Sequence, residues 1–396
     1  MKILIANLGS TSMKYRLFSF DGDQETLLAK GGLERVDDYR SAISTCLEEL
    51  KESGTLPSVR ELAAVGFKTV TAKGTSGCVE LNDDVLATME AYNKVAPAHN
   101  PPYIAGIRQF REAVPHVPLI GLFETAFYQW IPDSATRYGV PKSWHEAGVR
   151  RLGFHGASHK FIAERSAELL QRDDIAKQTR SLYVDGPQDT SGRGPLRVVS
   201  CHLGGSSSIT GIRNGVAIGN SMGLSPQSGV PMNNRVGDID VMALPYIIET
   251  TGVTLDQAVT ELSQNGGLKG VSTLSNDIRD LQKAADDGHS EAQMAIDFFV
   301  YEIRRWIGNY MFQMGGLEAL VFTAGIGENR AEIRNAVCSG LTDLGIIIDS
   351  EKNKSVRATE AFIQADHSKT KVLVIPTNEE VVVARETQRF LNTKTN

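Results

Sequence analysis

Cysteine is scarce in this sequence, and the few thiols are widely separated. The four cysteines, at positions 46, 78, 201 and 338, form no C-x-x-C pair. Because a structural zinc site needs such pairs and a disulfide framework needs a dense set of cysteines, neither is expected. Reduced, buried thiols suit a cytoplasmic protein, which is the localisation that we predict.

Long hydrophobic runs are also missing. The apolar run that follows Lys2 covers four residues before Asn7 interrupts it. The core of an export signal needs about 7–15 apolar residues, and a membrane span needs roughly 20. We therefore expect neither an export signal nor an association with a membrane.

An excess of basic charge is the third absence. The chain carries 41 Lys and Arg residues against 47 Asp and Glu residues, which gives a net charge of -6. No basic stripe is available to neutralise the phosphates along a duplex, so a nucleic-acid partner is not expected. A compact basic site inside a cleft is still compatible with this charge.

Two similar units stand far apart in the sequence. In the first, a strand at 2–6 leads into a bend at 9–12 that is rich in glycine and hydroxyl groups, and a strand at 14–20 follows. In the second, a strand at 196–201 leads into a similar bend at 202–208 before another strand. Such bends are common, so one unit alone would be uninformative. Their shared order, in a chain of 396 residues, predicts an internal duplication with two lobes.

Extended and helical patterns alternate through the rest of the chain. Residues 291–314 form a predicted long helix whose apolar residues cover most of its circumference, so we expect it to be buried. The polar segment 181–195 is expected to be a surface loop or insertion. Mixed elements in a repeated order predict an α/β fold of two lobes with a cleft between them. The other predicted strands lie at 63–70, 119–123, 319–323 and 372–375, and the other predicted helices at 39–50, 82–95, 101–111, 161–170, 240–250, 255–262, 330–339 and 379–392.

Both duplicated bends have the composition of phosphate-binding loops. Glycine lets backbone N–H groups approach a phosphate, and hydroxyl side chains add donors. Ser10 and Ser12 supply such hydroxyls in the first bend, with Lys14 two residues beyond as a point charge. The bend at 202–206 has the same character. The alternative for each bend is an ordinary hairpin turn.

A third glycine element follows the predicted strand at 319–323. Gly325-Ile326-Gly327 precedes a helix that we expect to begin near Glu328, so that its N-terminus would face an anion in the cleft. The third glycine of a dinucleotide-binding fingerprint is absent. A tight turn between a strand and a helix is the alternative.

Several polar residues stand in unusual contexts. His155 lies between glycines, His99 closely precedes two prolines, and Glu124 ends an apolar strand. Arg235 lies in the polar stretch 225–240, which glycine and proline punctuate. Loop positions that flank strands often carry function. For each residue, the alternative is a structural role such as a cap or a satisfied hydrogen bond.

Taken together, these segments resemble the acetate kinase family, the carboxylate kinases of the sugar kinase, heat-shock-70 and actin superfamily. The resemblance implies an α/β fold of two duplicated actin-like, ribonuclease-H-like lobes with a nucleotide cleft between them. The first lobe is expected at 1–146, completed by the C-terminal helix at 380–396, and the second lobe at 147–379. The motifs that carry the resemblance stand in the family's order over nearly the whole chain, as NLGSTSMK, AGVRRLGFHGASH, SMGLSP, NRVGDID, LVFTAGIGEN and PTNEE.

The same resemblance implies an ATP-dependent phosphotransferase that reversibly forms an acyl phosphate from a small carboxylic acid, as a homodimer joined through the second lobe. ATP or ADP and Mg²⁺, for which Mn²⁺ can substitute, are the implied cofactors, with Asn7 and Glu379 as metal ligands, directly or through water. The implied catalytic residues are Glu124, His155 and Arg235, and the last two would stabilise the phosphoryl group in flight. The implied acid-binding residues are Lys68, Val70, His99 and Pro226, and the implied nucleotide-binding residues are Asn7, Ser10, Ser12, Lys14, His202, Leu203, Gly204, Gly205, Ser206, Asp277, Ile278, Arg279, Gly325, Ile326, Gly327, Glu328 and Asn329.

Some residues depart from the family's pattern. Lys68 stands where an arginine is usual, Thr71 replaces a histidine, and Glu124 replaces an aspartate. Gly205 replaces the asparagine of an HLGNG loop. Arginine grips an anion with two parallel hydrogen bonds, whereas lysine supplies a point charge. A lost charged hydrogen bond costs about 1.5–3 kcal/mol, so the departures at the acid site leave the identity of the acid open.

Three functions are compatible with these residues. The first is an active kinase for acetate or another short-chain acid, which the retained phosphate-site and metal-site residues support. The second is a nucleotide-binding homologue with lost or altered kinase activity and a regulatory role, which the departures support. The third is a kinase for a sugar or another hydroxyl acceptor, for which Glu124 could act as the base.

Overall fold

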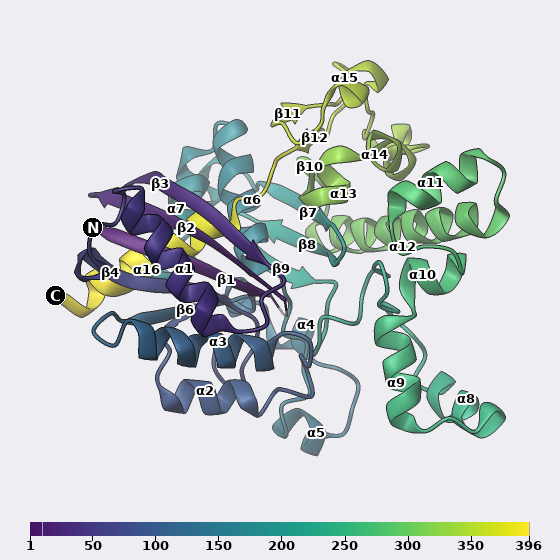
Figure 1. Ribbon diagram of the computed structural model, residues 1–396. Helices are drawn as coiled ribbons and strands as arrows, with labels where there is room; N and C mark the ends of the chain where they lie inside the picture. The colour runs from purple at the N-terminus through teal and green to yellow at the C-terminus, as the bar shows by residue number, and fades with distance from the viewer. Residues whose placement is uncertain (10, 396) are drawn as a thin grey trace.

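Two mixed β-sheets form the framework of the molecule (Figure 1). The computed structural model describes residues 1–9 and 11–395, and within them each sheet has six strands. The first sheet has the order β3-β2-β1-β4-β6-β5 and the second β9-β8-β7-β10-β12-β11. The strands are β1 (Lys2–Gly9), β2 (Ser12–Asp21), β3 (Gln24–Glu34), β4 (Leu62–Thr69), β5 (Cys78–Glu80), β6 (Leu119–Phe123), β7 (Arg197–Leu203), β8 (Ser207–Arg213), β9 (Val216–Asn220), β10 (Ala319–Thr323), β11 (Ala361–Phe362) and β12 (Lys371–Val374).

The two sheets have the same topology. β1 is antiparallel to β2 and parallel to β4, and β7 is antiparallel to β8 and parallel to β10. Each sheet therefore repeats one plan, in which an antiparallel meander is followed by two parallel strands and an antiparallel edge strand. The predicted duplication into two α/β lobes is confirmed.

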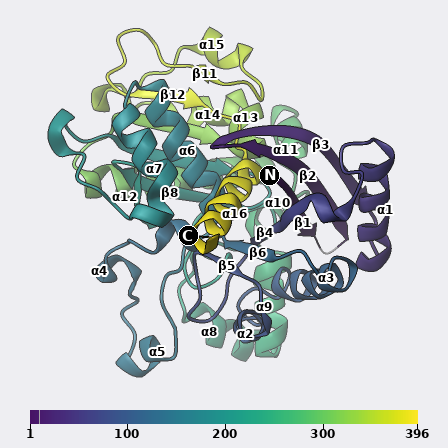
Figure 2. The same cartoon turned by 90° about the vertical axis from the view of Figure 1, so that its left-hand side faces the viewer.

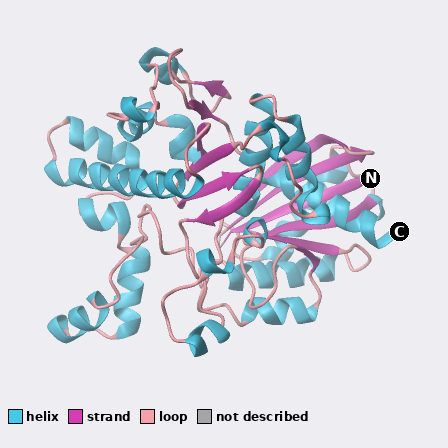
Figure 3. Ribbon diagram, turned by 180° about the vertical axis from the view of Figure 1, so that it is seen from behind, coloured by secondary structure: helices cyan, strands magenta, loops and turns pink. Residues whose placement is uncertain are grey.

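Helices cover both faces of each sheet, and Figure 3 shows the long α12 beside the strands of the second sheet. The apolar residues of α1 and α3 pack on one face of the first sheet, and those of α6 and α7 on one face of the second. The helices are α1 (Tyr39–Glu52), α2 (Asp83–Glu90), α3 (Asn100–Ala113), α4 (Asp133–Thr136), α5 (Lys142–Glu146), α6 (Gly156–Leu169), α7 (Asp173–Asp185), α8 (Ala243–Thr251), α9 (Leu255–Gln264), α10 (Gly267–Ser272), α11 (Ile278–Asp286), α12 (Ser290–Met314), α13 (Ala324–Asn329), α14 (Ala331–Cys338), α15 (Ser350–Ser355) and α16 (Glu379–Thr395).

The opening strand β1 is buried on both faces. Leu4 and Ala6 pack in the core beneath α1 and α3, while Ile3 and Ile5 pack against α16. Alternate residues of a strand point to opposite faces, so a strand covered on both sides reads as a continuous apolar run. The apolar run near the N-terminus is therefore the centre of the first lobe's core.

The C-terminal helix α16 lies with the first sheet. It packs against β1, β4 and β6, and it also contacts α6 from the second half of the chain. Figure 2 shows α16 between α6 and the first sheet. This packing supports the proposal that the C-terminal helix completes the lobe in which the chain begins.

Some predicted element boundaries differ from the structure. α7 extends to Asp185, so the first five residues of the predicted loop at 181–195 are helical. The reason is that Leu182 is buried in the core beside the second sheet. α6 begins at Gly156 rather than at 161, and α2 ends at Glu90 rather than at 95.

Helix α12 is buried on one face only. Ile296, Phe299 and Ile303 lie in the core of the second lobe, whereas Met294 is 60% exposed and Phe312 is 86% exposed. The expectation of a helix buried all round is wrong, because its apolar residues extend beyond the surface that the sheet covers. Among the residues that the structure describes, no helix is long and apolar enough to cross a membrane.

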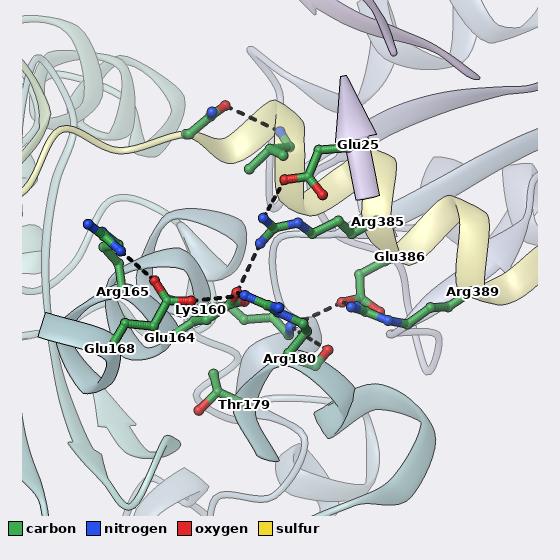
Figure 4. A network of polar contacts seen from close by, with 12 residues as sticks. Glu25, Lys160, Glu164, Arg165, Glu168, Thr179, Arg180, Arg385, Glu386 and Arg389 are labelled. Atoms are coloured by element: carbon green, nitrogen blue, oxygen red, sulfur yellow. Dashed lines mark hydrogen bonds and ion pairs between the residues drawn. The ribbon is translucent and has the colours of Figure 1, made fainter. Parts of the chain in front are cut away.

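A buried network of ion pairs joins α16 to α6 (Figure 4). Lys160 Nζ lies 3.0 Å from the Glu386 carboxylate, and both side chains are only 2% exposed. Beside this pair, Arg385 contacts both Glu25 and Glu164. The network ties together two helices that both begin in the region between the lobes.

Replacing Glu386 by glutamine is expected to lower the free energy of unfolding by about 3–5 kcal/mol. Glu386 is the carboxylate that pairs with Lys160, and burial already lowers the pKa of that ammonium group. Urea unfolding followed by circular dichroism measures the loss. The variant Lys160→Met/Glu386→Leu removes both charges of the buried pair and is the control. It should lie closer to wild type, because the third member of the network, Arg389, is partly exposed and can be hydrated when Glu386 is absent. Equal losses in both variants would contradict the ion-pair explanation.

Candidate functional site

The site lies where central strands of both sheets end. β4 and β7 end just after Lys68 and His202, and α16 begins beside them at Glu379. The Lys68 ammonium pairs with the Glu379 carboxylate, and His202 lies close enough to influence the pKa of that carboxyl. The strand ends of the two lobes therefore face one carboxylate. Ligands in open α/β sheets bind at this edge of the sheet.

Lys68 bridges two carboxylates. Its Nζ lies 2.7 Å from Glu379 Oε2 and 3.2 Å from Glu124 Oε1. β4 supplies the lysine, the residue after β6 supplies Glu124, and the first turn of α16 supplies Glu379. One cation between two ionised acids leaves a net negative charge, which favours a further cation at this position.

The two carboxylates differ in their tendency to ionise. Burial, with a contribution from the Glu379 charge, raises the pKa of Glu124 to about 6 although Lys68 opposes the shift. Burial also acts on Glu379, but the Lys68 ammonium outweighs it and lowers the pKa of that carboxyl. Within the described residues, Glu124 Oε2 is buried and has no hydrogen-bond partner, so it can accept one from a ligand.

Two imidazole rings are stacked beside this cluster. The ring centroids of His155 and His202 lie 4.0 Å apart, with an interplanar angle of 19°. His155 has a left-handed backbone, with φ of 58°, directly before α6. Burial lowers the pKa of His202 to about 4 and that of His155 well below its usual 6.5. Both rings are therefore neutral at pH 7, and each can donate a hydrogen bond without bringing a charge.

Arg235 is a half-buried cation whose hydrogen-bond partners are neutral. Its Nη1 donates to Ser206 Oγ at 3.1 Å and to the Pro226 carbonyl at 3.2 Å. Among residues 1–9 and 11–395, no carboxylate forms an ion pair with it. Burial lowers the pKa of Arg235, although a guanidinium stays charged at neutral pH. A partly desolvated cation without a counter-ion favours an anionic ligand.

Two of the predicted acid-binding residues, Pro226 and His99, lie near this guanidinium. His99 precedes α3, and burial, followed by the charge of Arg235, lowers its pKa to about 4. Val70 packs in one apolar cluster with Met232 of the second lobe. The carbonyl of Pro226, which is itself buried, accepts a hydrogen bond from Arg235. Residues predicted from separate segments therefore come together at one place.

The first phosphate bend presents Asn7 and Lys14 side by side. These residues are directly opposite each other on the paired strands β1 and β2, so their side chains share a face. Asn7 Oδ1 accepts a hydrogen bond from the Tyr103 hydroxyl at 2.7 Å. Ser12 is the first residue of β2, and Ser10 lies outside the described residues.

The second phosphate bend lies against the third glycine element. Gly204 approaches Ala324 at the start of α13, and the Gly205 carbonyl accepts a hydrogen bond from the backbone N–H of Asn233. Leu203 is buried in the core, so it can offer a ligand only backbone atoms. The bend at 202–206 and the glycine element at 325–329, both predicted to bind the nucleotide, are therefore neighbours.

The helix after β10 begins earlier than predicted. α13 starts at Ala324 rather than near Glu328, so Gly325, Ile326 and Gly327 are themselves helical. The Glu328 carboxylate turns back and accepts hydrogen bonds from the backbone N–H groups of Ala324 and Thr377, and burial raises the pKa of this carboxyl. Asn329, the last residue of α13, donates from its amide to the Gly325 carbonyl.

The third nucleotide segment begins α11. Asp277 caps this helix by accepting a hydrogen bond from the Arg279 backbone at 2.8 Å. Hydrogen bonds from the Arg279 guanidinium lower the pKa of Asp277, and the charge of Arg330 also contributes. Because Arg330 directly follows α13 and its charge acts on Asp277, the start of α11 lies close to the end of α13. Ile278 belongs to the core of the second lobe.

Residues that the sequence reasoning missed support the two stacked rings. Ser158 Oγ lies 2.8 Å from His202 Nδ1. His159 Nε2 and His155 Nδ1 each lie 2.8 Å from Ser208 Oγ. The sequence offered one signal for His159, which lies four residues after His155. Residues at this spacing share a helix face.

Acid is expected to unfold the protein through its buried histidines. Burial lowers the pKa from the usual 6.5 to about 4 at His99 and His202, and well below 6.5 at His155 and His159. Protonation therefore favours the unfolded chain, so stability is full above pH 6.5 and is lost as the pH falls toward 4. Each histidine contributes about 1.4 kcal/mol per pH unit in that window. Urea unfolding between about pH 5 and about pH 7.5 measures how steeply the free energy of unfolding depends on pH. His159→Gln should make this dependence less steep. An unchanged dependence would count against the buried histidines as its origin.

The sequence and the fold match known proteins over nearly the whole chain. A model described as the Acetokinase family matches residues 31–385. The chain is similar to the acetate kinase of Shouchella clausii (strain KSM-K16), with 39% identity over 98% of this chain and 99% of that protein. Its identity to the acetate kinase of Geobacillus kaustophilus (strain HTA426) is 38%, over 99% of both chains. Among solved structures, Porphyromonas gingivalis acetate kinase has a TM-score of 0.85 at 31% identity, over 98% of this chain and 99% of that one. A propionate kinase from Francisella tularensis has a TM-score of 0.83 at 31% identity and the same coverage.

Proposed function

The chain belongs to the acetate kinase family, and we propose that its acceptor is acetate or another short-chain carboxylic acid. The protein is an ATP-dependent carboxylate kinase with two similar, actin-like lobes. It transfers a phosphoryl group from ATP to a carboxylate and forms an acyl phosphate. The reverse reaction, which makes ATP from ADP and the acyl phosphate, belongs to the same proposal.

The observation that carries the proposal is the guanidinium of Arg235, which has neutral partners and lies beside the residues of the cleft. A phosphoryl group in transfer spreads negative charge over three oxygens, and cations and N–H donors stabilise it. Arg235 would supply the positive charge and His155 a neutral N–H donor. A carboxylate acceptor is already an anion, so the reaction needs no general base. An alcohol acceptor would need one, and one oxygen of the Glu124 carboxylate, Oε1, is already paired with Lys68.

We propose that two of the departures from the family's pattern, Lys68 and Glu124, compensate each other. Lys68 replaces an expected arginine, and Glu124 replaces an expected aspartate, and the two groups form an ion pair at 3.2 Å. The added methylene of Glu124 carries its carboxylate toward the single ammonium of the lysine. Lys68 therefore stays in contact with Glu124 while it also pairs with Glu379. This geometry favours an active enzyme over a homologue that has lost its activity.

The acid would lie between the two lobes. We propose that Val70 and Pro226 contact its alkyl group and that Lys68 and His99 lie near its carboxylate. Val70 and Met232 belong to the same apolar cluster, and the Pro226 carbonyl accepts a hydrogen bond from Arg235. An apolar wall beside a cation suits a short acid with a small alkyl group.

The nucleotide would lie along the second lobe. In this proposal, His202, Gly204, Gly205 and Ser206 face the phosphates together with Ser12 and Lys14 from the first lobe. The adenosine would lie between the α11 start, at Asp277, and the α13 segment that contains Gly325. Leu203 and Ile278 have buried side chains, so only their backbone atoms would contribute.

The residues near Lys68 also suit Mg²⁺ or Mn²⁺. Asn7 Oδ1 and the Glu379 carboxylate are oxygen donors, which these hard cations prefer. Lys68 contacts Glu379 through Oε2, so Oε1 is the atom we assign to a hydrated metal. In the described part of the chain, no group of three His, Cys, Asp or Glu side chains could hold a metal, and Mg²⁺ bound through few protein oxygens plus phosphates fits that composition. When bound, the ion neutralises phosphate charge.

We also propose a cytoplasmic homodimer in which α8 and α9 contact a second copy of the chain. Figure 1 shows these helices projecting from the second lobe. α8 contributes no buried residue, and Val241 and Tyr246 are 72% and 69% exposed. Light scattering after size-exclusion chromatography tests the proposal: wild type should have twice the chain mass, and Tyr246→Glu should shift it toward the monomer. A monomeric wild type would contradict it.

A hydroxamate assay tests the function directly. Acyl phosphates react with hydroxylamine to give hydroxamates, which form a coloured complex with added ferric iron. In the presence of ATP and Mg²⁺, the turnover of formate, acetate, propionate, butyrate and longer acids can therefore be compared. We expect turnover of at least one short acid, and ATP formation from its acyl phosphate and ADP. No turnover of any acid, with ATP still bound, would instead support the regulatory homologue.

A further inference from the structure

A continuous chain of hydroxyl groups and imidazole rings leads from the interior of the second lobe to His155. Ser200 Oγ lies 2.8 Å from His159 Nδ1, and His159 Nε2 lies 2.8 Å from Ser208 Oγ. The same Ser208 oxygen lies 2.8 Å from His155 Nδ1. β7 supplies Ser200, β8 supplies Ser208 and α6 supplies His159. The side chains of these three residues are completely buried, so protein groups alone decide how they are hydrogen bonded.

The hydrogen bonds that link these side chains can point in either of two directions, toward His155 or away from it. Burial lowers the pKa of both His155 and His159 well below 6.5, so both rings are neutral near pH 7. A neutral imidazole has one N–H and one bare nitrogen, and a hydroxyl group has a single hydrogen. Ser208 lies between the two rings, and within the described residues its hydroxyl contacts only these rings. If it accepted from both, its own buried hydrogen would have no acceptor, which costs about 1–3 kcal/mol. The favoured arrangements therefore have Ser208 donating to one ring and accepting from the other.

The Ser200 hydroxyl decides between the two directions. If Ser200 donates to His159 Nδ1, then His159 donates from Nε2 to Ser208, and Ser208 donates to His155 Nδ1. If the chain runs the other way, Ser200 must accept from His159, and its own hydrogen needs another acceptor. Within the described residues, the Ser200 hydroxyl contacts only His159. A buried hydroxyl without an acceptor costs about 1–3 kcal/mol, so the first direction is favoured.

We propose that Ser200, His159 and Ser208 are positioning residues that hold His155 in the tautomer protonated on Nε2. His155 then presents an N–H donor, rather than a lone pair, to the phosphoryl group. The proposal rests on the role in phosphoryl transfer given to His155 above. His159, Ser200 and Ser208 act through His155 and have no contact with substrate in this proposal.

The neighbouring ring is held in the same way. Thr377 Oγ1 donates to Ser158 Oγ at 2.9 Å, and Ser158 Oγ lies 2.8 Å from His202 Nδ1. Since Ser158 already accepts from Thr377, its hydrogen is available for His202 Nδ1, and this leaves the N–H of His202 on Nε2. The two stacked rings therefore offer the same kind of atom. A different serine contacts Nδ1 of each ring, Ser208 at His155 and Ser158 at His202. Each ring can therefore be held separately as an Nε2–H donor.

Nitrogen NMR of the protein labelled with ¹⁵N-histidine tests the tautomer without any substrate. The His155→Gln variant assigns the His155 signals. We expect wild-type His155 to have a protonated Nε2 and a bare Nδ1. Ser208→Ala should give a mixture of tautomers at His155, whereas Ser208→Thr, which keeps the hydroxyl, should retain the wild-type tautomer. The matched control is Ser166→Ala, a buried serine of α6 that bonds to the Ala163 carbonyl.

Kinetics give the second measurement. Groups that orient metal-bound histidines typically contribute about 10–100-fold to activity. By analogy we expect Ser208→Ala to lower kcat by about 10–100-fold, with little change in the KM for ATP. Ser208→Thr should recover most of the activity, and Ser166→Ala should match wild type. Wild-type His155 protonated on Nδ1, or an unchanged kcat in Ser208→Ala, would overturn the inference. A wild type without kinase activity would instead refute the proposed function, and the NMR result would still decide the tautomer.

Discussion

Replacing Arg235 by methionine is expected to lower kcat by about 10³–10⁵-fold, the contribution of arginines that stabilise transferring phosphoryl groups. Methionine keeps much of the volume of the side chain but removes its charge and its N–H donors. The guanidinium is half-buried and hydrogen bonds only to neutral groups in the described residues, Ser206 Oγ and the Pro226 carbonyl. The charge is therefore free to act on an anionic ligand rather than being used in a structural ion pair.

Steady-state kinetics in both directions measure this effect, and calorimetry with ATP shows whether the nucleotide still binds. Arg235→Lys should recover only part of the loss, because lysine keeps a point charge but cannot form two parallel hydrogen bonds. Arg213→Gln is the matched control, since this arginine is exposed at the end of β8 and lies outside the site. If Arg235→Met keeps more than about a tenth of the wild-type kcat, Arg235 does not stabilise the phosphoryl group.

Replacing Lys68 by methionine is expected to lower both activity and stability. The change leaves Glu124 and Glu379 facing each other without the cation that lies 3.2 Å and 2.7 Å from them. Breaking a buried ion pair from one side costs about 3–5 kcal/mol of stability. The lost charged contact should lower kcat/KM for the acid by roughly 10–150-fold. Urea unfolding and the hydroxamate assay measure the two effects.

Glu124→Gln in the Lys68→Met background is the control for stability. It removes one of the two facing charges, so it should restore part of the lost free energy of unfolding. A double variant that is no more stable than Lys68→Met would show that the loss has another cause.

The pair formed by Lys68 and Glu124 also allows a test of compensation. Lys68→Arg and Glu124→Asp should each lower activity when introduced alone, because each changes the length of one partner only. Together they should recover activity, with a coupling energy of about 0.5–3 kcal/mol. If the two changes instead raise a poor wild-type rate together and separately, the natural residues mark a degenerate site, and the regulatory alternative gains support.

Much of the fold was readable from local patterns in the sequence. The strand at 119–123, the helix before Gly315 and the duplicated bends follow from apolar periodicity and from glycine, and these features act over a few residues. The boundary errors arose where tertiary burial decided the outcome. Residues after 181 continue α7 because Leu182 enters the core, and Glu328 caps the helix that it was expected to start.

The site was predictable in composition but not in arrangement. The sequence alone indicated that His155, Glu124 and Arg235 stand in unusual contexts, and the resemblance to the family added Lys68. It could not show that Lys68 joins two carboxylates, since Glu379 lies 311 residues away in the sequence. The contribution of His159 was hidden for the same reason, because its partners come from two strands of the second sheet.

The sequence by itself determined the elements, the duplication, the family and the residue types available for chemistry, because strand and helix patterns, turn residues and motifs are local properties of the chain. Only the tertiary structure decided which of these groups are neighbours and which are charged. The packing of the two lobes brings β4, β7, α6 and α16 together, and burial there keeps the histidines neutral while Lys68 keeps Glu379 ionised. Distances and desolvation arise from contacts between distant segments, so they appear only when the chain is folded.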